Sequence, residues 1–175
     1  MVKVKSEHEI DLIREASKIV AEVLNLVGAQ VRPGVTTGEL DRLAEEYIRS
    51  CGATPAFKGY GASPDNLFPA TLCTSVDSEV VHGIPGSRVL RQGEILSVDV
   101  GVKKGGYFGD AARSFRVGQV TDEKDRLLTI TEEALHKGIE QAVEGNHVHD
   151  ISHAIQNHVE SHGFSVVRDL VGHGI

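Results

Sequence analysis

Two aspartates stand close together in the segment SVDVGVKKGGYFGDAARSF, residues 97–115, and together they could hold a cation. Asp99 interrupts an apolar run, and Asp110 follows a glycine a few residues later. Side chains alternate between the two faces of a strand, so the valines around Asp99 predict a core face and place Asp99 on the opposite face. A hairpin that turns at Lys104–Gly105 would put the two aspartates directly opposite each other, with Cβ atoms roughly 4.5–5.5 Å apart.

Like charges that face each other in this way destabilise a sheet. Three arrangements would relieve the repulsion. Water screens both charges if the face is exposed, one carboxylate takes up a proton so that the pair works as an acid and a base, or a cation lies between them. The cation interpretation requires further ligands, and it directs attention to the histidines.

Two histidines are each followed by glycine at the end of a strand-like apolar stretch: His82 in VVHGIPG and His173 in VGHGI. A strand end holds a side chain stiffly, which suits a ligand or a catalytic group. Spacing alone leaves a purely structural role equally open for both.

Other histidines crowd residues 147–162, where His149 and His153, and likewise His158 and His162, have i,i+4 spacing. This spacing places two side chains on the same face of a helix, where they could bind a metal ion. No glutamate completes an H-E-x-x-H pattern, however. We therefore interpret both pairs as part of a solvated helix face.

Periodicity and capping signals predict four helices and several strands that must position these residues. Ser6 with Glu9, and Thr36 with Glu39, have the spacing of capping boxes. The predicted helices start after Ser6, Thr36, Thr121 and Asp150, and the predicted strands cover about Leu72–Val81, two stretches of residues 94–117 around Lys103–Gly106, and the final segment FSVVRDLVGHGI.

The two helix pairs align with each other at a constant offset of 111 residues. Gly34 matches Gly145, Gly52 matches Gly163, and the apolar core positions match as well. Any two amphipathic helix pairs can be aligned in some register, but joint agreement of glycines and core favours an internal duplication. Counterparts of the aspartate-bearing strands would fall beyond residue 175. Because an incomplete sheet exposes its edges, we expect the chain to be a fragment.

Composition narrows the classes of protein that remain. The chain has 175 residues, 40% of them hydrophobic, which suits one domain with a real core. A net charge of −7 without a basic block argues against a nucleic-acid partner. No stretch approaches the ~20 apolar residues that span a bilayer, so no membrane partner is expected. Cys51 and Cys73 lack metal-type spacing, and no export signal supports a disulfide, so we expect free thiols in the cytoplasm.

The segments EVVHGIPG, ILSVDVGV, GYFGDAARSF and VGHGI resemble type I methionine aminopeptidases, and the resemblance extends over essentially the whole chain. It implies the pita-bread fold, an α+β, two-layer arrangement in which two related halves surround a curved antiparallel sheet. Residues 1–175 would then form a single but incomplete catalytic domain, with a first half of about 1–118 and the start of a second half at about 119–175.

The resemblance also implies roles for individual residues. Asp99, Asp110 and His173 correspond to ligands of two divalent metal ions, which are Co, Mn, Fe or Zn. His82 corresponds to a catalytic residue that binds the substrate beside the scissile bond. An apolar pocket for the methionine side chain is implied around three positions: Tyr60, Phe68 and Cys73.

The implied activity is removal of the initiator methionine from nascent proteins near the ribosome. The implied mechanism is attack on the first peptide bond by a hydroxide that two metal ions activate. We expect the full-length protein to be a monomer. The family has two further glutamate ligands and a second active-site histidine after the GHG motif, and this sequence ends at Ile175. We therefore expect weak metal binding and little activity from these residues alone. The alternatives are a metal-free binding module on the same fold and a pseudo-enzyme.

Overall fold

The computed structural model describes residues 3–175, which fold as two compact units. The first unit extends to Val120, and the second runs from Thr121 to Gly174. No described helix combines the length and the apolar character that crossing a membrane would require.

Two helices open the first unit, α1 (Glu7–Gly28) and α2 (Thr37–Ser50). Both predicted capping boxes are present: the Ser6 and Thr36 side chains accept from the backbone N–H three residues later, and the glutamate there accepts from the cap backbone. These reciprocal bonds satisfy backbone donors that a helix start otherwise leaves unpaired, and they set the first residue of each helix.

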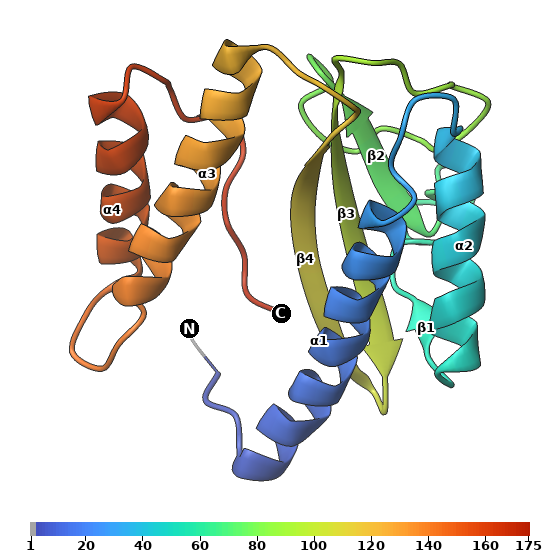
Figure 1. Ribbon diagram of the computed structural model, residues 1–175. Helices are drawn as coiled ribbons and strands as arrows, with labels where there is room; N and C mark the ends of the chain where they lie inside the picture. The colour runs from blue at the N-terminus through green and yellow to red at the C-terminus, as the bar shows by residue number, and fades with distance from the viewer. Residues whose placement is uncertain (1–2) are drawn as a thin grey trace. The chain divides into compact units, whose positions relative to one another are not determined.

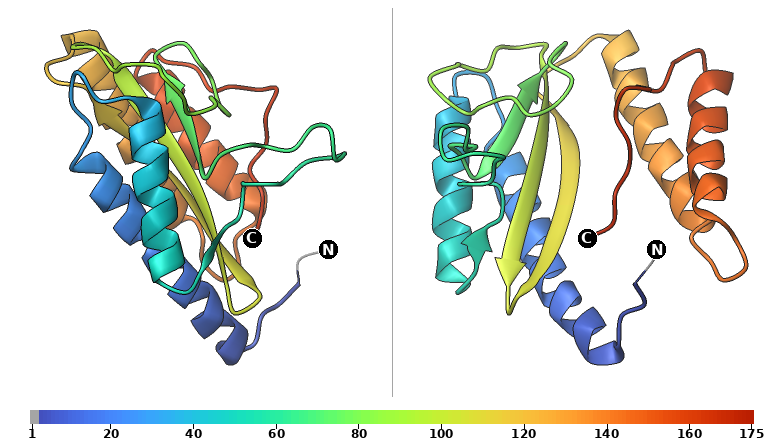
Figure 2. Two further views of the ribbon diagram at one scale, coloured as in Figure 1. Left: turned by 90° about the vertical axis from the view of Figure 1, so that its right-hand side faces the viewer. Right: turned by 180° about the vertical axis from the view of Figure 1, so that it is seen from behind.

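Four antiparallel strands follow, and β3 (Ile95–Lys104) is their centre. On one side β3 pairs with β1 (Thr54–Pro55) and β2 (Leu72–Val76), and on the other with β4 (Tyr107–Arg116). Helices α1 and α2 lie against the same face of this sheet (Figures 1 and 2). The predicted strand near Leu72–Val81 is real but ends at Val76, so His82 lies in a loop and not at a strand end.

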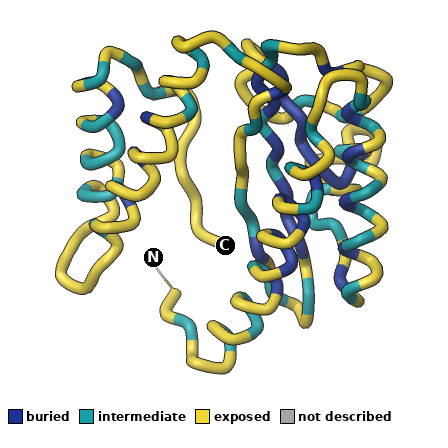
Figure 3. The backbone as a smooth tube through the Cα atoms, in the orientation of Figure 1, coloured by how far each residue is buried: buried dark blue, intermediate teal, exposed yellow. Residues whose placement is uncertain are grey.

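The core of the first unit lies between the two helices and one face of the sheet, where buried positions concentrate in Figure 3. As the valine pattern predicted, alternate residues of β3 are fully buried, while Ser97 and Asp99 are only partly covered. The buried side chains of β3 are Leu96, Val98, Val100 and Val102. The opposite face of the sheet is therefore the one that carries the polar groups.

The predicted pairing of the hairpin is wrong by two residues. Lys104 pairs with Tyr107, so Asp99 lies opposite Ala112 and not opposite Asp110. The turn consists of Gly105 and Gly106, whose φ values are +58° and +86°. A two-residue hairpin turn of this kind requires positive φ at both positions, which glycine adopts at little cost and lysine does not.

The second unit is a helical hairpin, α3 (Asp122–Glu140) and α4 (Val148–Ser161). Thr121 caps α3 as predicted. The N-cap of α4 is His147, not Asp150, which lies three residues further on and accepts a hydrogen bond from the His147 backbone N–H. Both ends of α4 follow those of α2 by 111 residues, the offset found in the sequence.

The final segment forms no strand among the described residues, contrary to expectation. Residues 164–175 run on after α4 without regular structure, and His173 lies there with an exposed side chain. A strand is stabilised by ladder hydrogen bonds to a neighbour. No strand of the described chain pairs with this segment.

Candidate metal and substrate site

Asp99 and Asp110 project from the same face of the β3–β4 hairpin. Asp110 lies opposite Gly101, two residues along β3 from Asp99, so the aspartates are diagonal neighbours. A shift of two residues leaves every side chain on its original face, and the expected grouping survives the wrong register. Diagonal Cα atoms are about 7–8 Å apart, which lessens the repulsion expected of directly opposed carboxylates. Both aspartates are half-buried.

Cys73 forms the third side of this group. It lies directly opposite Asp99 on β2, and its side chain is buried, with 6% of the residue exposed. Burial first, and then the negative charges of Asp99 and Asp110, raise the pKa of the thiol to about 12. Cys73 is therefore a neutral, apolar neighbour of both carboxylates at physiological pH.

Asp41 on α2 holds the start of β2 in place. Its carboxylate oxygen accepts hydrogen bonds from the backbone N–H groups of Thr71 and Leu72, at 2.9 and 2.8 Å. Burial raises the pKa of Asp41, although the two backbone hydrogen bonds oppose that shift. Because Cys73 follows directly, Asp41 fixes the strand that presents the thiol to Asp99.

The loop carrying His82 is anchored to the face of the sheet that bears the aspartates. Gly83 donates its N–H to Ser75 Oγ at 3.1 Å, and its carbonyl accepts from the N–H of Thr74 at 2.8 Å. A Cβ at Gly83 would lie 2.2 Å from the Thr74 carbonyl oxygen, so only glycine permits this approach. Ser75 shares its face with Cys73, two residues away on the strand.

His82 itself is exposed and has a φ of +59°. A non-glycine residue in this left-handed region costs free energy, and such residues concentrate at functional sites. The two hydrogen bonds that Gly83 makes with β2 help to hold the His82 backbone in this conformation. The HG dipeptide thus combines an exposed imidazole with a residue that can approach β2 closely.

Phe57 belongs to this face, although the sequence reasoning did not identify it. A Cβ at Gly101 would lie 2.6 Å from Phe57 Cε1, so the ring covers the glycine that pairs with Asp110. An isolated glycine inside a strand is a recognised sign that another group approaches closely. Gly101 was therefore the feature of the sequence that could have indicated a close contact at this position.

Tyr60 and Phe68 lie at the two ends of one loop, which two backbone hydrogen bonds close. The Gly59 N–H donates to the Phe68 carbonyl, and the Phe68 N–H donates to the Tyr60 carbonyl, both at 2.8 Å. Phe68 is half-buried, whereas Tyr60 is 78% exposed. The loop brings the backbones of these two residues together, but the Tyr60 ring remains exposed to solvent.

His173 belongs to the second unit, in the segment after α4, and its Nδ1 lies 3.1 Å from the carbonyl oxygen of Gly174. The structure thus groups Asp99, Asp110 and Cys73 on one sheet face. His82 is tethered to that face through Gly83.

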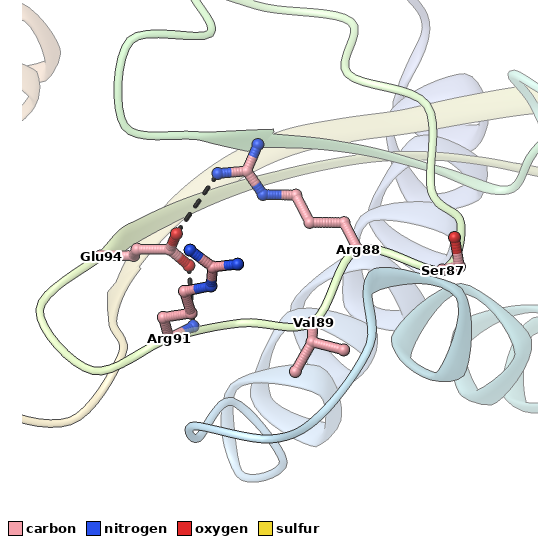
Figure 4. A pocket seen from close by; sticks show the side chains of 5 residues that line it. All are labelled: Ser87, Arg88, Val89, Arg91 and Glu94. Atoms are coloured by element: carbon pink, nitrogen blue, oxygen red, sulfur yellow. Dashed lines mark hydrogen bonds and ion pairs between the residues drawn. The ribbon is translucent and has the colours of Figure 1, made fainter.

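A surface hollow in the first unit lies in the loop before β3 and is lined by Ser87, Arg88, Val89, Arg91 and Glu94 (Figure 4). Its volume is about 500 Å³. Arg88 is paired with Glu79 and Glu94, and Glu94 also accepts from the backbone N–H of Arg91. The lining has a single carboxylate, which is paired with Arg88, and neither histidine nor cysteine, so this hollow offers no comparable set of metal ligands.

The donor set on the aspartate face fits divalent metal ions. Two half-buried carboxylates from adjacent strands supply hard oxygen ligands, which suit ions such as Mn²⁺, and carboxylates also bind Zn²⁺. The neutral Cys73 thiol beside them is not a competing thiolate. A cation there would also offset the mutual repulsion of the two aspartates.

This fold and this pair of carboxylates define a class of hydrolase that uses metal ions. Residues 11–175 match Metallopeptidase family M24, and the chain belongs to that family. The chain is 55% identical to the methionine aminopeptidase of Clostridium perfringens over 176 aligned residues, covering all of this chain and 68% of that protein.

Solved structures agree with the family assignment. The methionine aminopeptidase of Rickettsia prowazekii matches with a TM-score of 0.94 at 40% identity, and that of Thermotoga maritima with a TM-score of 0.95 at 40% identity. All of this chain is covered in both comparisons, together with 68% and 69% of the other chain. The fold is accordingly the α+β pita-bread fold of these metallopeptidases, as the sequence motifs predicted.

Proposed function

We propose that this protein removes the N-terminal methionine from nascent polypeptides by metal-dependent hydrolysis. The observation that carries the proposal is the diagonal pair of carboxylates, Asp99 and Asp110, on the face of the sheet opposite the core. Family membership and the names of the similar proteins support the same reaction. Residues 1–175 would form part of one catalytic domain.

Asp99, Asp110 and His173 are the residues proposed to hold two divalent ions, Co²⁺, Mn²⁺, Fe²⁺ or Zn²⁺. When bound, such ions lower the pKa of water and polarise a carbonyl group. The carboxylates also provide negative charge that attracts the free α-amino group of a substrate. This attraction would favour cleavage at a chain terminus over cleavage within a chain.

His82 is the proposed catalytic residue of the chain itself. Its exposed imidazole can form a hydrogen bond with the scissile peptide group and stabilise charge that develops there. The two hydrogen bonds of Gly83 to β2 hold the backbone that follows His82, which limits the positions open to the imidazole.

The methionine side chain would be bound by Tyr60, Phe68 and Cys73, with Phe57 added from the structure. A thioether contacts aromatic rings favourably, and the neutral thiol of Cys73 adds an apolar, polarisable surface. The exposed Tyr60 ring would become covered when the side chain binds. Both cysteines are free thiols, which is compatible with the proposed action in the cytoplasm on newly made proteins.

Cleavage of the tripeptide Met-Gly-Met by the full-length protein with added Mn²⁺ or Co²⁺ tests the proposal. Asp99→Asn should abolish cleavage and weaken Mn²⁺ binding in isothermal titration, because it removes a charged ligand. Asp11→Asn, at an exposed position of α1, is the matched control and should retain both properties. Cleavage that persists in Asp99→Asn would rule out the mechanism. A protein that binds no divalent ion would favour a metal-free binding module.

A further inference from the structure

The second unit carries a group of side chains that the proposed function does not use. Glu133 on α3 and His158 and His162 on α4 each offer one ligand atom, and these atoms lie within 4.8 Å of one another. Figures 1 and 2 show the two helices packed side by side. The group therefore bridges both helices of the unit.

His158 is not on a solvated face, which corrects the expectation for this pair of histidines. Its side chain is only 18% exposed, and its Nε2 lies 2.9 Å from a carboxylate oxygen of Glu133. By contrast His149 and His153, with the same i,i+4 spacing on α4, are both exposed as expected. Packing against α3 distinguishes the two pairs.

The tautomer of the neutral His162 ring follows from its hydrogen-bond partner. Its Nδ1 lies 2.7 Å from the backbone carbonyl oxygen of His158, and a carbonyl oxygen can only accept a hydrogen bond. Nδ1 must therefore carry the proton, which leaves a lone pair on Nε2 of the neutral ring. Metal-binding histidines are typically oriented in this manner, with the second ring nitrogen donating to a carbonyl or carboxylate.

The position on the helix also favours a cation. His158 lies in the last turn of α4 and His162 is its C-cap, where the helix dipole is negative. Glu133 adds a formal negative charge. The nearby guanidinium of Arg126 is engaged elsewhere, since it donates to the His162 carbonyl and lies 5.0 Å from the ring centre of Phe164.

We propose that Glu133, His158 and His162 form a Zn²⁺ site that joins α3 to α4, distinct from the proposed ions at Asp99 and Asp110. Two imidazoles and one carboxylate form a donor set used by three-ligand zinc sites, whereas Ca²⁺ and Mg²⁺ prefer oxygen ligands throughout. At bond lengths of about 2.0–2.2 Å, tetrahedral ligands lie about 3.4 Å apart, so the 2.9 Å separation of His158 Nε2 from the Glu133 oxygen must lengthen slightly, while the other separations start at no more than 4.8 Å.

Binding would shift a proton within His158 and stabilise the second unit. In the metal-free chain His158 Nε2 donates its proton to Glu133, and when Nε2 binds zinc the neutral ring carries that proton on Nδ1 instead. Only a few apolar residues are buried in this unit, Ile130, Ala134 and Val159. An ion that binds the folded state of the α3–α4 hairpin and not its unfolded state would increase the stability of this unit.

Titration with Zn²⁺ tests the site in the complete chain with Asp99→Asn and Asp110→Asn, which removes the carboxylate ligands of the first unit. One equivalent should bind, with shifts of the His158 and His162 imidazole signals in long-range ¹H–¹⁵N spectra. His162→Ala and Glu133→Gln should each weaken Zn²⁺ binding by at least ~10-fold. Loss of a residue that only supports a metal ligand already weakens binding by about that much, and these two residues are proposed as direct ligands. Glu133→Gln lies at an exposed position, so folding should be retained, as helical circular dichroism would verify.

The double variant His149→Ala and His153→Ala is the matched control, because it removes an exposed histidine pair of equal spacing from the same helix. It should leave the affinity unchanged. The proposal is overturned if no equivalent binds, if this control loses affinity as His162→Ala does, or if zinc binds without moving the His158 and His162 signals.

Discussion

Replacing Gly109 with alanine tests why a glycine directly precedes Asp110. Gly109 pairs with Val102 and faces α1, where an added Cβ would lie 2.6 Å from Ser17 N and 2.7 Å from the carbonyl carbon of Ala16. These are backbone atoms of a helix and cannot rotate away. Ordinary contact begins at 3.4 Å, so α1 and β4 must separate by about 0.8 Å.

This separation would disturb both the core and the site. Ala16 and Val23 of α1 are completely buried, and overpacking of a tight core costs about 1–3 kcal/mol. The same displacement moves the strand that carries Asp110. A misplacement near 1 Å can reduce turnover about 100-fold, so the proposed cleavage activity should fall as well.

Urea unfolding of Gly109→Ala, followed by tyrosine fluorescence, measures the loss of stability. All three tyrosines, at positions 47, 60 and 107, belong to the first unit, so the signal reports that unit alone. Gly86→Ala is the control, because a Cβ there meets nothing within 4 Å and should change the free energy of unfolding by less than about 0.5 kcal/mol. If Gly109→Ala unfolds at the same urea concentration as the wild type, the close packing of α1 on β4 is not what requires this glycine.

Three further predictions concern single residues of the first unit. In chelator-treated protein at pH 8, iodoacetamide should modify Cys51 and leave Cys73 unmodified, because Cys73 is buried with a pKa of about 12; mass spectrometry of the peptides checks this, and rapid modification of Cys73 would contradict it. Asp41→Ala should lower the free energy of unfolding by about 1–3 kcal/mol, since it leaves the backbone N–H groups of Thr71 and Leu72 without an acceptor. The pKa of Asp41 is raised in the folded state, so protonation favours folding. The difference in free energy of unfolding between wild type and Asp41→Ala should therefore widen as pH falls from 7 toward 3.8. A difference that narrows in urea titrations would refute the reasoning. Thr36→Ala removes the cap of α2 and should cost about 0.5–2 kcal/mol in the same titrations, whereas Thr36→Ser should restore most of it.

The sequence by itself determined the features that depend on neighbouring residues. Capping boxes and apolar periodicity identified where α1 and α2 begin, and Thr121 marked the start of α3. Strand alternation placed Asp99 on the face opposite the core. The diglycine turn also carried the information for the true register, since both residues adopt positive φ, and the wrong pairing came from including Lys104 in the turn.

Tertiary structure decided which distant residues meet. Phe57 covers Gly101, Gly83 holds His82 beside Ser75, and His158 pairs with Glu133, although the partners lie between 8 and 44 residues apart in the chain. Local propensities act over a few residues and set no such distances. These contacts form only when strands, loops and helices that are distant in the sequence pack together within a complete unit.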